Sequence, residues 1–300
     1  MKVCVIGGAN MDITAASAGL FVAGDSNPGT VRTAPGGVGR NIAHNLCLLG
    51  DEVSLVTVFG GDGFGKMLKS HCRSLGMDLS LSQTVSGARN ACFVSVGGPD
   101  GELLGGVADM AVTGLMTPEW LEERLDRING FDAVVADTNL PAETLSALVA
   151  CCEPPLYLDA VSSAKASRLR QALLTPMLHS DRIFALKCNR LEAESLGLWG
   201  PEARDGAYAS RVQRLYISLG SGGVLVREDE FVQQMPSLPV TGIVNTTGAG
   251  DAMCAGIVHA GPGTDAASAA RFGLECARCS MLSPEAVNED IRKLKYEQIS

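Results

Sequence analysis

The segment Asn245–Ile257, which reads NTTGAGDAMCAGI, constrains the fold of this chain more than any other. Three small residues, Gly248, Ala249 and Gly250, lead into Asp251 and then into an apolar run that predicts the first turns of a buried helix. Because this loop has no bulky side chains, its backbone N–H groups can turn toward an anion, and the helix N-terminus adds partial positive charge. A carboxylate beside such an anion hole can accept the proton of a hydroxyl that attacks a phosphoryl group. The alternative is an ordinary glycine-rich turn in which the helix dipole favours Asp251.

Composition bounds the class of protein. The 300 residues suffice for one large or two modest domains, and 46% hydrophobic residues with 35 glycines are typical of a compact α/β enzyme. A formal net charge of −9 argues against non-specific binding to nucleic acid, which needs a basic surface. The apolar run before Gly7 is too short for a signal peptide, and no stretch reaches the roughly 18 apolar residues of a membrane span. We therefore expect neither nucleic acid nor a membrane as a partner.

The cysteines favour a reducing compartment. Ten are scattered along the chain, and many lie inside apolar runs, including Cys4, Cys47, Cys92 and Cys254. This pattern is typical of buried thiols in the cytoplasm and not of a disulfide framework. The four histidines are dispersed, and the single CxxC near the end has no second pair to complete a zinc site. We expect a cytoplasmic protein without a structural metal.

The first strand is expected at Lys2–Ile6 and ends in GGANMD. A dinucleotide-binding turn needs GxGxxG, but Ala9 and Asp12 replace the second and third glycines. Asn10 and Asp12 can instead bind vicinal hydroxyls of a sugar. The alternative is an Asx turn that closes the strand.

The segment PGGVGRNIAHNLCLLG predicts a helix from Arg40 onward that stops at Gly50. Gly36 and Gly37 before it allow a ligand to approach the backbone, and Asn41 lies in the first turn. The alternative is a tight turn followed by a buried polar residue. Further on, GGDGFGKM resembles a P-loop, but Met replaces the magnesium-binding Ser or Thr, so we expect a structural turn entering a helix.

Two segments predict a small sheet apart from the main one. Residues 90–107 alternate and turn at GGPDG, which indicates a hairpin, and residues 13–34 are rich in turn residues. Together they are a candidate lid. From Trp120 the pattern becomes helix then strand, and the strands are continuously apolar. Such strands indicate a parallel sheet buried on both faces, with Asp137, Asn139 and Asp159 at carboxyl ends, where α/β folds bind ligands.

Two later turns are candidates for phosphate contacts. Asn189 and Glu192 lie at a strand-to-helix junction, where a Glu is commonly a capping residue. The functional alternative is a magnesium and phosphate contact through water. The strand expected at Leu215–Leu219 runs into the glycine-rich turn at Gly220 and Gly223.

These motifs occur in one known order, and the chain resembles the ribokinase-like (PfkB) carbohydrate kinase family over essentially its full length. One family signature is GGVGRNIA from Gly36, with Gly50 and Gly60 at the expected intervals, and the other is NTTGAGDAMCAGI. The resemblance implies a three-layer α/β/α sandwich with a central, mostly parallel sheet and a small β-sheet lid. It implies a single kinase domain over residues 1–300, with lid segments at about 13–34 and 90–107.

The resemblance implies ATP-dependent transfer of the γ-phosphoryl group to a primary hydroxyl of a nucleoside or sugar, with ATP as co-substrate and Mg²⁺ as cofactor. The combination of GGANMD, DSNPG-x5-PGGVGRN, KxNRLEAE and NTTGAGDAM is most similar to members that phosphorylate the 5′-hydroxyl of pseudouridine. The alternatives are a kinase for ribose, another nucleoside or another sugar, and a non-catalytic nucleotide-binding descendant. The family's lid often pairs between subunits, which implies a homodimer.

The resemblance also assigns residues. Asp251 matches the family's general base. The family's anion hole is matched by Gly248, Ala249 and Gly250. The positions that hold the sugar hydroxyls match Asn10, Asp12, Gly36, Gly37 and Asn41, and further substrate contacts match Asn139 and Lys165. The nucleotide contacts match Asn189, Ser218, Gly220 and Gly223, and the magnesium contact, through water, matches Glu192.

Some positions depart from the family pattern. Many members carry Asp where this chain has Asn245, so activation by a monovalent cation is in doubt. Cys188 replaces the usual Pro between Lys187 and Asn189, which changes loop stiffness more than chemistry. The stretch 199–214 is shorter and less regular than the family's connecting helix.

Overall fold

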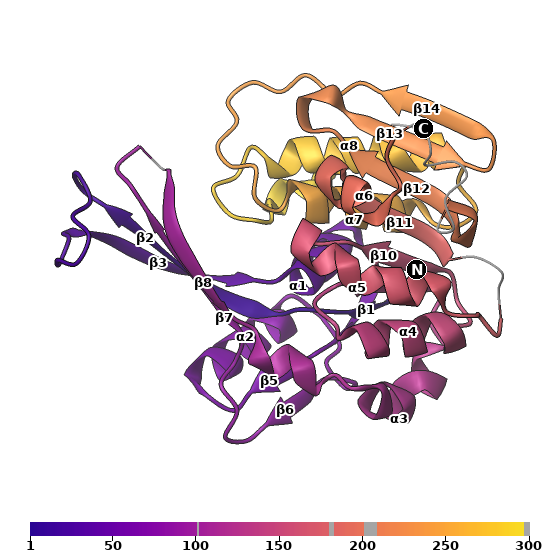
Figure 1. The fold of residues 1–300 in the computed structure, drawn as a ribbon, viewed down its shortest axis with the longest axis horizontal. Helices are drawn as coiled ribbons and strands as arrows, with labels where there is room; N and C mark the ends of the chain where they lie inside the picture. The colour runs from indigo at the N-terminus through magenta and orange to yellow at the C-terminus, as the bar shows by residue number, and fades with distance from the viewer. Residues whose placement is uncertain (101, 180–182, 201–208, 297–300) are drawn as a thin grey trace.

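The computed structural model describes residues 1–100, 102–179, 183–200 and 209–296, and one large sheet forms its centre (Figure 1). The strands lie in the order β14-β13-β12-β11-β10-β9-β1-β4. Those from β12 to β4 pair parallel, whereas β13 and β14 pair antiparallel at one edge. Their bounds are β1 Lys2–Ile6, β4 Glu52–Val56, β9 Ala133–Asp137, β10 Leu156–Asp159, β11 Ile183–Asn189, β12 Val212–Ser218, β13 Val224–Glu228 and β14 Phe231–Met235.

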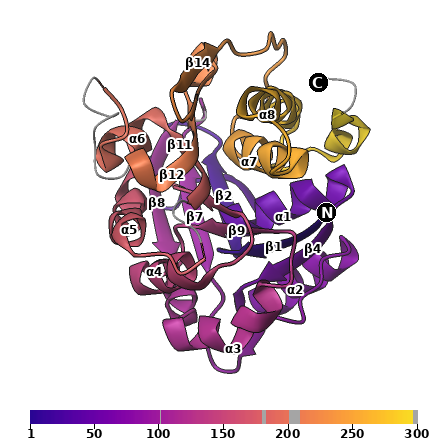
Figure 2. The same ribbon diagram turned by 90° about the vertical axis from the view of Figure 1, so that its right-hand side faces the viewer.

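Helices cover both faces of this sheet, which makes three layers (Figure 2). On one face are α3 Pro118–Ile128, α4 Ala142–Cys151, α5 Ser163–Leu174 and α6 Arg190–Leu196. On the other face are α1 Val38–Leu49, α2 Gly63–Ser74, α7 Ala249–Ala260 and α8 Ala266–Ser280. Alternate residues of one strand enter different cores: Val134 packs with the first set of helices and Val135 with the second. The continuous apolar strands therefore have the predicted cause, since both of their faces are buried.

A smaller sheet extends away from the body (Figure 1). Its order is β3-β2-β7-β8, with bounds β2 Asn10–Ser17, β3 Gly29–Gly36, β7 Cys92–Gly97 and β8 Leu103–Asp109. Strand β2 pairs antiparallel with β3 and parallel with β7, so the turn-rich segment and the hairpin share one sheet. A short parallel pair, β5 Val58–Gly60 and β6 Gln83–Val85, lies on the body.

Local signals explain where several elements begin. The helix expected from Arg40 begins at Val38 and ends before Gly50, which adopts the left-handed conformation that glycine tolerates. The P-loop-like turn is structural, because the Asp62 side chain caps α2 by accepting from the Gly65 N–H at 2.9 Å. Its other carboxylate oxygen accepts from the Asn90 N–H at 3.0 Å. Much of the irregular stretch 199–214 falls on residues 201–208, outside the described ranges. Among helices within those ranges, none has the length and apolar character needed to cross a membrane.

Candidate active site

The N-terminus of α7 forms the glycine-rich turn predicted from the sequence. Gly248 precedes the helix in the left-handed conformation, with φ 84°, and a Cβ there would overlap the Ala286 carbonyl, so only glycine fits. In the described part of the chain, the N–H groups of Gly250 and Asp251 have no hydrogen-bond acceptor. Free N–H groups at a helix N-terminus can bind an anion, which is the chemistry expected of this turn.

Asp251 lies in the first turn of α7 and is buried, with 9% of its surface exposed. The pKa of its carboxyl is raised to about 7, mainly by burial and to a smaller extent by the nearby Asp159 carboxylate. Lys187 and a hydrogen bond from Asn41 act in the opposite direction on this pKa. The Asn41 Nδ2 atom donates to Asp251 Oδ2 at 2.7 Å. A carboxylate with a pKa near neutrality is suited to accept a proton from an alcohol during a reaction.

Arg40, which sequence reasoning did not assign, orients this amide. Its buried guanidinium donates to Asn41 Oδ1 and to the Pro35 carbonyl oxygen, the latter at 2.7 Å. Because Asn41 Oδ1 accepts from Arg40, Asn41 must direct its Nδ2 toward Asp251. The neighbouring Gly36 carbonyl also accepts from Arg40 Nε, at 3.3 Å. The arginine thereby links the end of β3 to the first turn of α1.

Lys187 and Asp159 form a buried ion pair beneath the helix N-terminus. They lie at the ends of β11 and β10, at paired positions in the parallel register. The Lys187 Nζ atom is 3.0 Å from Asp159 Oδ2. A Cβ built on Gly250 would lie 2.7 Å from this Nζ atom, so the glycine leaves room for the ammonium group. Sequence reasoning placed Lys187 only in a loop motif, because the register that buries it is not visible in the sequence.

The predicted sugar-binding residues meet where β2 and β3 leave the body. Asn10 pairs with Gly36 in the register, and Asn10 Nδ2 donates to Asp12 Oδ1 at 2.6 Å. A Cβ at Gly36 would overlap the Asp12 carboxylate. Gly37 has φ 99° and lies against the Gly8 carbonyl, so neither glycine tolerates a side chain. Because neither glycine carries a side chain, a ligand can approach the polar groups at the start of β2 closely.

Asp137, which the sequence placed only at a strand end, connects three segments of the site. Its Oδ2 atom accepts from the N–H groups of Gly8 and Gly39 at 2.9 and 2.8 Å. Its Oδ1 atom accepts from the Asn139 N–H at 2.8 Å. Three backbone N–H groups bind this carboxylate, so we assign it to loop geometry.

Asn139 and Lys165 lie together beside this junction. The Lys165 Nζ atom donates to Asn139 Oδ1 at 2.6 Å, and burial lowers the pKa of Lys165. A Cβ on Gly8 would lie 2.7 Å from Asn139 Nδ2, which brings the amide to the turn after β1. The structure thus places both predicted substrate contacts beside the turn after β1.

A cavity of about 520 Å³ lies on the other side of the α7 N-terminus. Its lining includes residues predicted for the nucleotide and the anion hole: Ser218, Gly220, Gly223, Ala249 and Gly250. Apolar side chains, among them Leu238, Met253 and Leu274, form much of its wall. An adjoining cavity of about 660 Å³ is lined by Asn189, Ser218 and Gly220. Apolar walls and a few polar groups beside an anion hole suit a nucleotide.

The Asn189–Glu192 pair forms a capping box. Asn189 Oδ1 accepts from the Glu192 N–H at 2.9 Å, and Glu192 Oε2 accepts from the Asn189 N–H at 2.7 Å. Glu192 Oε1 also accepts from Asn189 Nδ2 at 2.6 Å. Both carboxylate oxygens are engaged, which fits contact with a hydrated magnesium ion through water and not direct ligation. Within the described ranges, no group of three His, Cys, Asp or Glu side chains could hold a metal.

Asn245 shapes the loop before the anion hole. Its Nδ2 atom donates to the Pro284 carbonyl and its Oδ1 accepts from the Thr247 N–H, both at 3.0 Å. The side-chain amide of Asn245 therefore stabilises the loop through both of its polar atoms.

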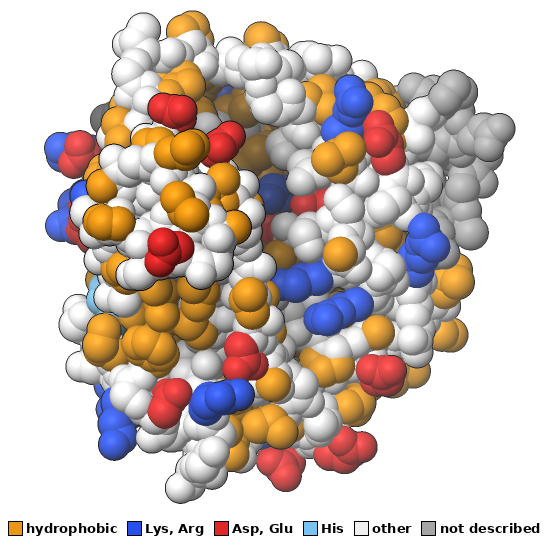
Figure 3. Space-filling model, turned by 60° about the vertical axis from the view of Figure 1, so that its left-hand side comes forward, with side chains coloured by type: hydrophobic (Ala, Val, Ile, Leu, Met, Phe, Trp, Pro, Cys, Tyr) orange, Lys and Arg blue, Asp and Glu red, His pale blue; other side chains and the backbone are white. Residues whose placement is uncertain are grey.

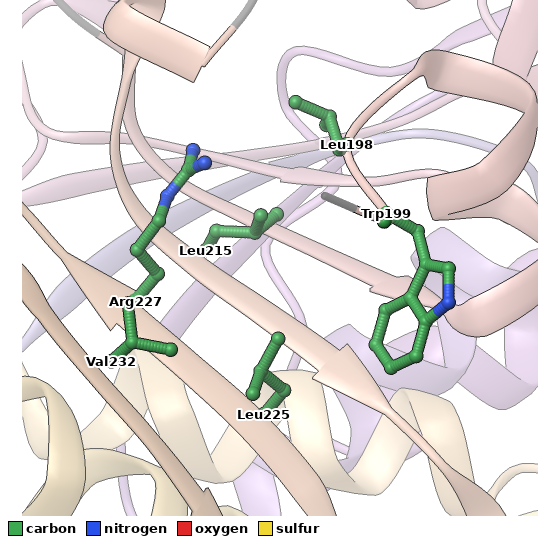
Figure 4. Close-up of a pocket in the computed structure, with 7 residues that line it drawn as sticks. Leu198, Trp199, Leu215, Leu225, Arg227 and Val232 are labelled. Carbon is green, nitrogen blue, oxygen red and sulfur yellow. The ribbon is translucent and has the colours of Figure 1, made fainter. Parts of the chain in front are cut away.

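The surface is hollowed on the face that carries the small sheet, with basic and acidic side chains at the floor of the hollow (Figure 3). A separate cavity of about 280 Å³ lies beyond α6 and contains none of the predicted site residues. Figure 4 shows Leu198 and Trp199 beside Leu215 of β12 and Leu225 of β13. Nothing in its lining connects it to the chemistry of Asp251.

A buried carboxylate beside free N–H groups at a helix N-terminus, next to a cavity of about 520 Å³, is the arrangement expected of enzymes that transfer phosphoryl groups to small molecules. The model of the pfkB family carbohydrate kinases matches residues 1–293. The chain belongs to this family, and it is an ATP-dependent small-molecule kinase.

Relatives support this placement. The pseudouridine kinase of Escherichia coli (strain K12) is 33% identical over 299 residues, which cover 96% of this chain and 93% of that protein. A ribokinase of Bacillus subtilis (strain 168) is 28% identical over 94% of this chain and 93% of its own. Among solved structures, a carbohydrate kinase from Agrobacterium tumefaciens has a TM-score of 0.83 and 28% identity, covering 99% of this chain and 97% of that one. The Arabidopsis thaliana ribokinase complexed with ribose and ATP has a TM-score of 0.84 at 21% identity, covering 98% of this chain and 99% of that one, and so shows the shared fold.

Proposed function

We propose that this kinase phosphorylates the 5′-hydroxyl of pseudouridine, with Mg-ATP as the donor. The similarity to the E. coli pseudouridine kinase supports this acceptor. The combination of the four motifs in this chain, which resembles that group, supports it as well. The observation that carries the chemistry is the buried Asp251, with a pKa raised to about 7, in the first turn of α7 beside the nucleotide-sized cavity.

In the proposed reaction, Asp251 accepts the proton of the attacking 5′-hydroxyl. The hydroxyl oxygen forms a bond to the γ-phosphorus while the bond from that phosphorus to the ADP oxygen breaks. The free N–H groups of Gly250 and Asp251 stabilise the charge on the transferring oxygens. Asn41 holds the carboxylate in place by its hydrogen bond. The product retains the phosphoryl group, and Asp251 releases its proton after the product leaves.

The sugar and the base have separate contacts in this proposal. The hydrogen bond from Asn10 to Asp12 leaves Asn10 Oδ1 and Asp12 Oδ2 as acceptors for two sugar hydroxyls. Lys165 occupies Asn139 Oδ1, so Asn139 Nδ2 remains a donor for a carbonyl oxygen of the base. Gly36 and Gly37 allow the sugar to approach β2 closely.

The nucleotide contacts are proposed on the opposite side of α7. Ser218, Gly220 and Gly223 border the cavity of about 520 Å³, and Asn189 borders the adjoining one. Magnesium would be held by the phosphates and by water, with Glu192 as a contact through water. The ion supplies neutralisation of phosphate charge when bound.

The small sheet is proposed as a lid. Transfer to an alcohol competes with transfer to water, so the site needs a cover that excludes solvent. Asp12 and Phe93 are paired residues on the face of the small sheet that is proposed to cover the site, while Ile13 and Val94 are paired on its opposite face.

The opposite face of the small sheet also carries Val107, which pairs with Val94 and is 71% exposed. A second copy of the chain is proposed to cover this face. Sedimentation of the purified protein tests whether a dimer forms.

The proposed location is the cytoplasm, since ATP is abundant there and the ten cysteines are free thiols.

A coupled assay of ADP release tests the acceptor. Purified protein with Mg-ATP is compared on pseudouridine, uridine, adenosine, ribose and fructose 6-phosphate. A preference for pseudouridine of about tenfold or more over each alternative is the expected result. Uridine is the sharpest control, because it has the same sugar and the same ring with a different point of attachment. Faster turnover of ribose would keep the family and overturn the acceptor, and nucleotide binding without transfer to any acceptor would favour a binding protein.

A further inference from the structure

We propose that Lys187 is a further catalytic residue, whose ammonium group contacts the transferring phosphoryl group at the N-terminus of α7. This inference rests on the proposed function, because it assumes that the phosphoryl group lies between this turn and the acceptor. The relevant geometry is the position of Nζ. It is close enough to Gly250 that a Cβ there would lie only 2.7 Å away.

The ammonium group has hydrogen-bonding capacity to spare. It carries three N–H donors. Within the described ranges its ionic partner is Asp159, with Nζ 3.0 Å from Oδ2, and the structure gives it no hydrogen bond to another residue. Lys187 is 9% exposed, so water satisfies little of this remaining capacity. A buried donor without an acceptor is costly unless a ligand supplies one.

The surroundings of Nζ favour an anion. The N–H groups of Gly250 and Asp251 are free and belong to the same helix turn. A γ-phosphoryl oxygen there would receive donors from the turn and a positive charge from beneath it. Such a fixed cation stabilises a transition state in which charge spreads over the phosphoryl oxygens.

The charges also balance during the reaction. Before transfer, Lys187 faces the carboxylates of Asp159 and Asp251, and both lie among the groups that raise the Lys187 pKa above its usual value. When Asp251 accepts the hydroxyl proton it becomes neutral, and its attraction for the ammonium disappears. Lys187 keeps its own proton throughout and is then free to stabilise the phosphoryl oxygens as the bond to ADP breaks.

A structural role is the alternative, in which Lys187 only neutralises the buried Asp159. The two roles predict different outcomes for paired variants. Lys187→Met removes the cation and leaves Asp159 buried without its partner, which destabilises the fold. The double variant Lys187→Met with Asp159→Asn removes both charges and keeps similar volumes. A structural role predicts that the double variant regains activity, and a catalytic role predicts that it does not.

The test combines turnover with binding of a transition-state mimic. We would measure kcat with the acceptor that the wild type phosphorylates best, and the affinity for Mg-ADP with and without aluminium fluoride. For the double variant we expect a loss in kcat of about 10²- to 10³-fold, as for removal of one oxyanion donor. Its affinity for Mg-ADP alone should stay within about threefold of wild type. The gain in affinity that aluminium fluoride gives the wild type should be lost.

Two further variants complete the test. Lys187→Arg keeps the charge and should retain part of the aluminium fluoride response. Asp159→Asn keeps the cation and should lose far less activity than the double variant. If the double variant turns over within about tenfold of wild type, or binds the mimic as tightly, the inference fails while the kinase assignment stands. If the wild type transfers phosphate to no acceptor, the proposed substrate fails, and the binding of the mimic still decides the role of Lys187.

Discussion

The Asn41 amide donates to the Asp251 carboxylate at 2.7 Å, although the two residues are 210 positions apart in the chain. Asn41 comes from the first turn of α1 and Asp251 from the first turn of α7. Both family signatures therefore meet in one hydrogen bond. It joins the residues proposed to bind the sugar to the proposed anion hole.

Replacement of Asn41 by Ala should raise the pKa of Asp251, because a hydrogen bond that favours the ionised carboxylate is lost. A hydrogen bond to a charged group contributes about 1.5–3 kcal/mol, which corresponds to about 1–2 pKa units. We expect the acidic limb of the kcat profile to move to higher pH by about that amount. The matched control is Asn45→Ala, one turn further along α1, which removes a hydrogen bond to the Asn41 carbonyl. If the acidic limb of the kcat profile stays at the same pH in Asn41→Ala, the limb does not report the ionisation of Asp251.

Asp251→Asn should abolish most turnover and keep the binding of ATP. General-base catalysis contributes roughly 10²–10⁴-fold, so kcat should fall by at least that range. Titration with a fluorescent ATP analogue should give a dissociation constant close to that of wild type. Near-normal turnover would refute the role of the carboxylate as the base.

The same variant should change how stability depends on pH. The folded-state pKa of Asp251 is raised from 3.8 to about 7, so the native state binds an extra proton between these values. The contribution of this group to stability is therefore present below the unfolded-state pKa and is lost as the pH rises through about 7. We expect the Tm of Asp251→Asn to exceed that of wild type at pH 8, and the difference to shrink toward pH 5. If wild type and Asp251→Asn have the same Tm at pH 8 and also at pH 5, burial does not disfavour the ionised form of Asp251.

Gly250→Ala should impair transfer through Lys187. The new Cβ would lie 2.7 Å from the Lys187 Nζ atom, so the ammonium group must move. We expect kcat to fall by about 10-fold or more, a part of the loss expected when a phosphoryl-stabilising donor is removed entirely. The control is Gly263→Ala, where a Cβ has nothing within 4 Å and φ is not in the left-handed region. If kcat is unchanged in both Gly250→Ala and Gly263→Ala, displacement of the Lys187 ammonium group does not affect phosphoryl transfer.

The lid proposal predicts a change in hydrogen exchange. Adding pseudouridine and a non-hydrolysable ATP analogue should slow amide exchange in residues 13–34 and 90–107, because closure removes these strands from solvent. Helix α3, on the body, serves as the internal reference. If the amide exchange rates of both segments are the same with and without the ligands, the sheet does not close over the sugar.

The sequence predicted those structural features around Asp251 that depend on the local order of residues. Glycines that tolerate φ of 84° or 99°, and polar residues next to them, are visible as short motifs. The parallel sheet was predictable from continuously apolar strands, because burial on both faces removes the alternation.

The remaining residues depend on pairing that the sequence does not display. Lys187 meets Asp159 only through the register of β10 and β11, and a lone lysine is ordinarily expected at the surface. Arg40 sits in a recognised motif, but its role follows from the carbonyl groups that it reaches. Asp137 organises three segments by accepting from backbone N–H groups, whose directions exist only in the folded chain.

Strand β2 carries Asn10 and Asp12 at its start and continues without interruption into the small sheet. If that sheet swings, the two proposed sugar contacts must turn with it. Acceptor affinity and the open-closed equilibrium are then linked, and each must alter the other by the same factor. A substitution far out on β2 or β3 that favours the open position should weaken acceptor binding and hasten product dissociation, although it touches neither ligand.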